Sequence, residues 1–239
     1  MRLVRMVSAA NWRNAVGEIV LIVIGILIAL AVTSWYEARL DRRNEVLILE
    51  QLHETLTEDL QEIESTYDMT RDRERNLLRL LDYLESEEPY TPELGVTFQA
   101  LFGWRTVRIK TAPFEALKAQ SYKAISSAEL RYMLIAFYED QFARLEYNSF
   151  LDRDLAIQKI QPYFFEHFVL GVGESTDVDG GRQSWTPKDY AQIRSDAYLA
   201  NLCRYRADIL RRFVLRDYEI ATRAMQDILV AIELELAEY

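Results

Sequence analysis

The sequence predicts an all-α protein in which one N-terminal transmembrane helix continues into an elongated antiparallel bundle of long helices. Three observations support this fold class. Residues 19–36 contain no charged side chain. Neither proline nor glycine occurs between Gly25 and Pro89. Apolar residues recur at intervals of three and four in most of the remaining chain, which is the spacing that places them on one face of a helix.

The uncharged stretch has the length and the flanks of a membrane anchor. At a rise of about 1.5 Å per residue, its 18 residues cover roughly 27 Å, close to the hydrocarbon core of a bilayer. Trp12 precedes the stretch, and Trp35 and Tyr36 end it, where aromatic side chains anchor a helix in the two interfaces. The alternatives are a buried core helix and a cleaved signal peptide.

Small residues recur at every fourth position of this helix, a pattern that lets two membrane helices approach closely. They are Gly17, Gly25, Ala29 and Thr33, with Leu21 completing the row. The pattern predicts a homodimer or a partner membrane helix, although glycine and alanine are also frequent in membrane helices in general. Glu18 lies near the same face, where a carboxylate is costly unless it is paired with Arg13 or lipid headgroups, or has a function.

The flanking charges bear on orientation. Three arginines precede the helix on a short tail and three follow it, so their number does not show which end of the helix lies in the cytoplasm. A first helix with a short basic tail usually keeps its N-terminus in the cytoplasm, which predicts a domain outside the cytoplasm. The expected parts are a basic tail over residues 1–15, a transmembrane helix over 16–36 and an acidic helical-bundle domain over 37–239.

Residues 17–30, GEIVLIVIGILIAL, resemble the N-terminal signature of an uncharacterised bacterial single-pass membrane-protein family. Residues 112–121, APFEALKAQS, are similar to a second element of that family, but Ala119 and Gln120 depart from its usual serine or glycine. The resemblance implies a single-pass protein of the bacterial inner membrane with a helical domain. It implies no activity, because none is assigned to the family.

Composition narrows the classes of function. Three of the 28 basic and one of the 38 acidic residues precede Glu37. Residues 37–239 therefore contain 25 basic and 37 acidic residues and carry a net charge of −12. An acidic domain argues against nucleic acid as a partner. The single cysteine, Cys203, excludes an intramolecular disulfide and a cysteine metal cluster. It lies among apolar helical positions, which predicts a small core residue.

After the anchor, one helix is predicted to continue to about residue 86, with a possible bend near Asp68. Strict heptads hold only from Leu49 to Ile63, too few for a coiled coil. Short helices are expected over 93–102 and 113–119, and a longer one over 128–160, which Pro162 kinks or ends. Residues 171–187 have the composition of a loop. The last long helix starts near residue 196 and includes Phe213 in its apolar stripe.

Residues 87–125 are the least regular part and are locally basic. Trp104, Arg105, Arg108 and Lys110 are the best candidates for binding a small anion or an acidic partner. The alternative is a solvated connector with Trp104 packed in the core.

No catalytic or cofactor motif is present. The sequence contains no phosphate-binding glycine loop, no G-x-S-x-G, no H-E-x-x-H and no C-x-x-C. His53 and His167 are the only histidines, and Glu50 with His53 makes only half of a di-metal pattern. We therefore expect no catalytic residues, no metal and no cofactor, and a membrane-anchored interaction or sensory domain. The alternatives are an accessory subunit of a membrane complex, or an enzyme with a carboxylate-rich site in the bundle.

Overall fold

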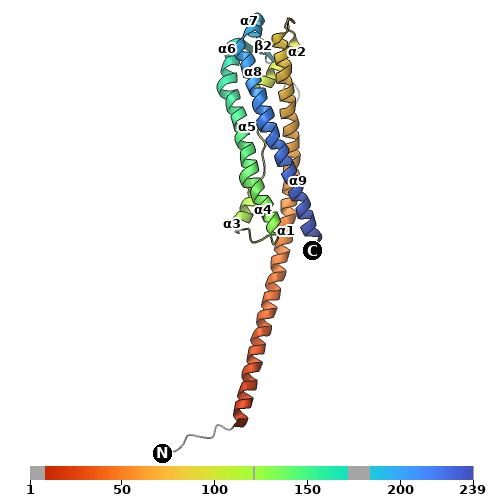
Figure 1. Ribbon diagram of the computed structural model, residues 1–239, viewed down its shortest axis with the longest axis vertical. Helices are drawn as coiled ribbons and strands as arrows, with labels where there is room; N and C mark the ends of the chain where they lie inside the picture. Colours follow the sequence, from red (N-terminus) through yellow and green to blue (C-terminus); the bar gives the residue numbers. More distant parts are fainter. Residues whose placement is uncertain (1–8, 121, 172–183, 239) are drawn as a thin grey trace, which may run out of the picture. The chain divides into compact units, whose positions relative to one another are not determined.

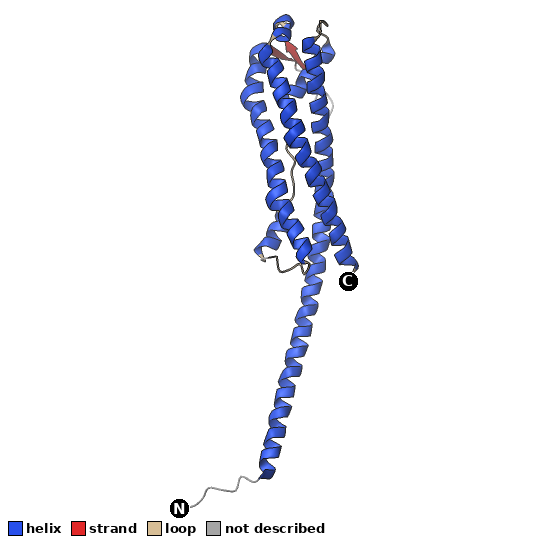
Figure 2. Ribbon diagram, viewed as in Figure 1, coloured by secondary structure: helices blue, strands red, loops and turns tan. Residues whose placement is uncertain are grey.

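The computed structural model describes residues 9–120, 122–171 and 184–238. The structure is 84% helical, which confirms the all-α prediction, and one small two-stranded sheet is added to it (Figure 2). The chain divides into two compact units, Met1–Ile48 and Leu49–Tyr239. The predicted continuous helix is present as α1 (Ala9–Glu85), with no break near Asp68.

The first unit contains the N-terminal part of α1. In the part of the chain that the structure describes, α1 is the one helix long and apolar enough to cross a membrane. Its most apolar 18-residue window has a mean hydropathy of 2.7 and contains no buried residue. A helix in the core of this chain would have those side chains covered. The exposed apolar surface therefore supports a membrane anchor over a core helix.

The second unit is built on three long helical runs (Figure 1). The first run is the part of α1 from Leu49. The second comprises α4 (Ala128–Ala136), η1 (Phe137–Phe142), α5 (Ala143–Leu155), η2 (Ala156–Ile160) and α6 (Gln161–His167). The third comprises α8 (Ala197–Ile209), η3 (Leu210–Val214) and α9 (Leu215–Ala237). Their facing sides form an apolar core that includes Leu52, Leu56 and Ile63 of α1.

The direction of the runs explains the irregular middle region. The second run ascends in the same sense as α1, whereas the third run descends (Figure 1). The chain must therefore return between α1 and the second run. It does so between α2 (Pro92–Phe102) and α3 (Ala112–Ala119). Residues 103–111, called the connector below, have neither helix nor strand. Nine extended residues cover about 30 Å.

The segments η1, η2 and η3 are π-helical turns inside the two later runs. A π turn accommodates one residue more than an α turn and rotates the residues that follow. Pro162 is the second residue of α6, two positions after the end of η2, and the helical run continues to His167. The sequence did not predict these turns, and Phe213, expected in the apolar stripe, is 50% exposed.

Aromatic side chains fill one end of the second unit. Phe164 and Phe168 stack with ring centroids 4.4 Å apart, and Phe98 of α2 lies 4.8 Å from Phe168. Strand β1 (Phe168–Gly171) pairs antiparallel with β2 (Ser184–Pro187), and Trp185 of β2 packs 5.2 Å from Phe164. The loop prediction for residues 171–187 is wrong at both ends. Its central residues, 172–183, lie outside the described ranges. The short helix α7 (Tyr190–Ser195) follows.

Candidate functional site

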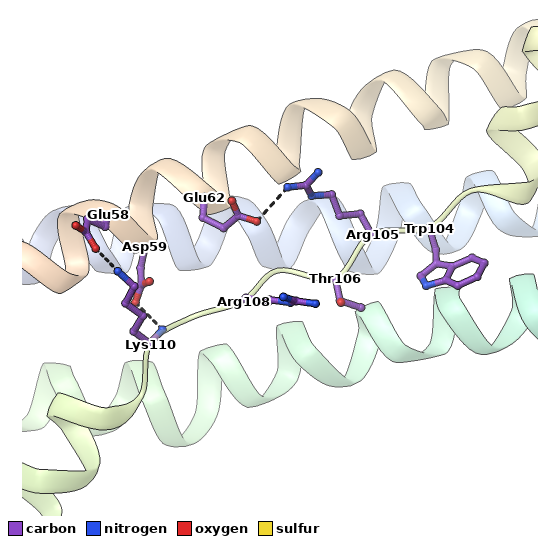
Figure 3. Close-up of a pocket in the computed structure, with 8 residues that line it drawn as sticks. All are labelled: Glu58, Asp59, Glu62, Trp104, Arg105, Thr106, Arg108 and Lys110. Carbon is purple, nitrogen blue, oxygen red and sulfur yellow. Dashed lines mark hydrogen bonds and ion pairs between the residues drawn. The ribbon is translucent and has the colours of Figure 1, made fainter. Parts of the chain in front are cut away.

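The four predicted patch residues line one cleft, between α1 and the connector (Figure 3). The cleft has a volume of about 670 Å³. Helix α1 contributes Glu58, Asp59 and Glu62, and the connector contributes Trp104, Arg105, Thr106, Arg108 and Lys110. Glu58 and Glu62 are four residues apart and therefore share one face of the helix. An acidic wall thus faces a basic wall across the cleft.

Two of the three cations in the patch are neutralised by carboxylates of α1. The Arg105 guanidinium lies 3.3 Å from Glu62 and also reaches Met69 Sδ at 3.5 Å. The Lys110 ammonium forms an ion pair with Glu58. All four charged groups are more than a third exposed, so solvent screens both pairs and each contributes little to stability. The patch is therefore not a plain basic surface, and its pairs can open at small cost.

Arg108 and Thr106 differ from the other polar residues of the cleft. Neither side chain makes an ion pair or hydrogen bond with the described residues, and Arg108 is exposed. Both point away from the acidic wall, and the Arg108 guanidinium extends toward Thr106 (Figure 3). Trp104 is half-buried, with its ring 6.4 Å from Phe102. Within the described ranges, the cleft therefore offers one guanidinium without a polar partner, next to a hydroxyl and an indole.

Asp59 is the buried carboxylate of the acidic wall. Its Oδ2 accepts a hydrogen bond of 3.0 Å from the Lys110 backbone N–H, which fixes the end of the connector against α1. Burial raises the pKa of Asp59, and this effect exceeds the opposing effect of Lys110. The nearby Tyr138 hydroxyl is also buried, has no hydrogen-bond partner among the described residues, and has its pKa raised by burial and by the Asp59 charge.

A second polar cluster, which the sequence did not predict, lies in the core behind the connector. The fully buried Arg206 makes two hydrogen bonds to Asp152, at 2.7 and 2.9 Å. It also donates to the backbone carbonyl oxygens of Leu101 and Gly103, the latter at 2.6 Å. Arg206 therefore holds the start of the connector to α5 and α8. An arginine between the apolar residues Cys203 and Leu210 was the available signal in the sequence.

The other buried carboxylates of this unit are also paired. Asp217 accepts hydrogen bonds from Arg144 Nε at 3.0 Å and from Asn148 Nδ2 at 2.6 Å. Glu74 accepts one from Arg211 Nε at 2.9 Å. The described residues include no group of three or more histidine, cysteine or carboxylate side chains that could hold a metal ion.

The two histidines lie apart. His53 Nε2 is 3.1 Å from Glu233 on α9, whereas His167 packs against the Tyr163 ring at the aromatic end. Neither contributes to the cleft.

The predicted membrane residues lie on the first unit. Trp12, Trp35 and Tyr36 are exposed at 70, 63 and 58%. Nothing lies within 4 Å of a Cβ built at Gly17 or Gly25. Thr33 donates a hydrogen bond of 3.0 Å to the Ala29 carbonyl oxygen, and Glu18 is exposed. Among the described residues, no atom contacts the small-residue row at Gly17 or Gly25, so the row forms an open face there.

Comparison with known families identifies the chain. The sequence model described as "Family of unknown function (DUF6090)" matches residues 18–180. The chain belongs to this family. In this DUF6090 protein the match begins at Glu18 in the apolar part of α1 and includes the cleft, the connector, Arg73 and Asp152. Helices α8 and α9, with Arg206, lie beyond it. No curated protein and no solved structure matches the chain.

Proposed function

We propose that this protein is a membrane-anchored helical domain that acts by binding a ligand or a partner, not by catalysis. The observation that carries the proposal is the cleft between α1 and the connector. Its charged pairs are exposed and easily opened, and Arg108, Thr106 and Trp104 are free to receive an anionic group. The proposal leaves out catalysis because the buried carboxylates of Asp59, Glu74, Asp152 and Asp217 are engaged by arginine, amide or backbone groups.

Site-specific photocrosslinking tests the cleft as a binding site. A photoreactive amino acid replaces Glu62, on the cleft wall opposite Arg108, in the full chain in its own membranes, and a matched control replaces Tyr132 of α4, which is 73% exposed and outside the cleft. This position keeps Arg108, Thr106 and Trp104 in place. We expect an adduct of defined mass at position 62 that is absent at position 132. The mass distinguishes a small ligand from a protein. No adduct at position 62, or the same adduct at both positions, would contradict the proposal.

The proposed location is the bacterial inner membrane, with the N-terminus in the cytoplasm and the bundle in the periplasm. The short basic tail and the resemblance of residues 17–30 to a bacterial signature support it. A tag after Tyr239 reports the orientation when intact spheroplasts are treated with protease. Loss of the tag is the expected result. A tag that disappears only after lysis would place the bundle in the cytoplasm.

A second candidate function is that of an accessory subunit in a larger membrane complex. It is favoured by the open face at Gly17 and Gly25 and by the exposed Glu18 on the same helix. Under the first proposal the face joins two copies of this chain, and under the second it meets a different helix. Gly25→Leu, with Ile24→Leu as the control on another face, should weaken self-association in detergent. An unchanged oligomer size in Gly25→Leu would remove the homodimer.

A further inference from the structure

The connector is fixed at both ends and unpaired between them. At its start, the Gly103 carbonyl oxygen accepts a hydrogen bond of 2.6 Å from Arg206, and at its end the Lys110 N–H donates one of 3.0 Å to Asp59. Within the described chain, residues 104–109 make no hydrogen bond between their backbone and another backbone group. They include no proline, so every one of them carries an N–H donor and a C=O acceptor that require partners.

This unpaired segment has the properties of an edge strand. None of residues 104–109 lies in a turn or a bend, and none has a positive φ angle. A row of unpaired N–H and C=O groups on an extended chain is a template for pairing with a second extended chain. Because Gly103 and Lys110 are already held, pairing orders few additional residues of the connector, which lowers the entropic cost of binding.

The side chains of the connector alternate as they do in a strand. Arg105 points to Glu62 of α1, whereas Thr106 and Arg108 point away from that wall (Figure 3). Trp104, Thr106 and Arg108 are two residues apart in sequence and therefore share one face of the extended segment. A neighbouring strand presents its own side chains to this face at every second position. A residue opposite Trp104 and a residue opposite Arg108 are then four positions apart.

The cleft beside the connector has room for an extended chain. Strands lie about 4.8 Å apart, sheets pack about 10 Å apart and each residue adds about 3.3 Å, so one extended residue occupies roughly 160 Å³. The cleft volume of about 670 Å³ therefore admits about four residues. Residues 104–109 extend about 20 Å, which is longer than four residues. A chain paired along all of them continues past the cleft, as an internal segment of a larger protein does.

We propose that the connector binds an extended segment of a partner protein, which adds as a β-strand along residues 104–109, with a carboxylate on Arg108 and an apolar side chain on Trp104. This inference rests on the proposed binding function of the cleft and specifies the partner. Main-chain hydrogen bonds supply the affinity in this mode, and alternate side chains supply the specificity. Because three carboxylates line the same cleft, a segment with one acidic residue fits better than a polyacidic one.

A positional-scanning library of six-residue peptides with acetylated and amidated ends tests the inference on the full chain in detergent. The library should select aspartate or glutamate four positions from an apolar residue. Alternate N–H groups of a strand point to opposite edges. Methylating one alternating set of backbone nitrogens in the selected peptide should therefore abolish binding, whereas methylating the other set should be tolerated.

A pair of variants tests the role of Arg108. Arg108→Met should weaken binding of the selected peptide about tenfold or more and remove the preference for an acidic residue, because a hydrogen bond to a charged group is lost. Arg71→Met is the matched control, since Arg71 is exposed on α1 and outside the cleft. The affinity of that variant should equal that of the wild type.

Hydrogen exchange of the wild-type protein gives a readout that no variant affects. With the selected peptide at about 100 times its Kd, alternate amides among residues 104–109 should exchange up to about 100-fold more slowly. No selected peptide, or equal binding with either set of nitrogens methylated, would overturn the inference. An adduct of small-molecule mass at position 62 would also overturn it and leave the proposed binding function standing. The absence of any adduct there would remove both.

Discussion

Replacing Arg206 by methionine should strongly destabilise the second unit. The change removes a side chain that joins Asp152 of α5 to the backbone at the start of the connector. Methionine fills a similar volume and adds no cavity of consequence. The predicted effect therefore comes from the lost charge and hydrogen bonds and not from lost packing.

The magnitude follows from the four hydrogen bonds of Arg206. Two go to Asp152 and one each to the carbonyl oxygens of Leu101 and Gly103. Removing one partner of a buried ion pair costs about 3–5 kcal/mol, and two orphaned carbonyls add to the cost. Arg73, 3.9 Å from Asp152, can move closer and offset part of it. We expect a loss of about 3–5 kcal/mol, or roughly 6–20 °C in Tm for a domain of this size.

Circular dichroism of the full chain in detergent measures the change. Arg204→Met is the matched control, because Arg204 is two residues away on the same helix and its pair with Glu85 is exposed at 53 and 62%. That variant should lose at most about 1 kcal/mol. In Arg206→Met, hydrogen exchange of the Lys110 amide should also accelerate, since the connector is released at Gly103. Equal Tm values for the two variants would refute the reasoning.

Three further outcomes follow from the same contacts. Burial raises the pKa of the Asp59 carboxyl group above 3.8, so the folded protein binds a proton at Asp59 more readily than the unfolded chain does. The ionised carboxylate therefore lowers the stability of the folded protein at pH values above its folded pKa. Asp59→Asn should therefore melt higher than wild type at about pH 7, and the gap should close as pH falls below 3.8; a gap that widens in acid would contradict this. Cys203 is fully buried, and burial raises its pKa to about 12, so a disulfide reagent at about pH 8 should react only after denaturant is added. A rapid reaction of the native protein would show that the thiol is reachable. Arg105→Met should change the free energy of unfolding by less than about 1 kcal/mol in a denaturant titration, because its pair with Glu62 is exposed.

The sequence predicts the elements whose signals are local. The length of α1 follows from the absence of proline and glycine, and its apolar window follows from the uncharged run. The four patch residues were predicted together because they are neighbours in the chain. Their carboxylate partners, Glu58 and Glu62, lie more than 40 residues earlier, and only the return of the connector along α1 brings them near. Pairing at that distance has no signature in a single sequence.

The core cluster was missed for a different reason. Arg73 and Glu74 belong to a charged segment whose composition is typical of a solvent-exposed helix face. Both side chains nevertheless point inward, because Asp152 and Arg211 supply partners from other helices. The small sheet was missed because its strands have four residues each and pair across a long intervening segment. Phe213 was placed inward because a continuous α-helical period was assumed through η3, where the π turn rotates the stripe.

One series of buried positions in the third run has a regular period. The series is Leu199, Cys203, Arg206, Leu210, Val214, Asp217, Ala221, Met225, Ile228 and Ile232. Their steps of four, three and four residues repeat about every eleven residues, not every seven. An eleven-residue period keeps the inner edge straight or turns it slightly to the right, whereas a heptad imposes a left-handed supercoil. The helices that pack against these positions must therefore place their own contact residues at matching intervals of about eleven residues.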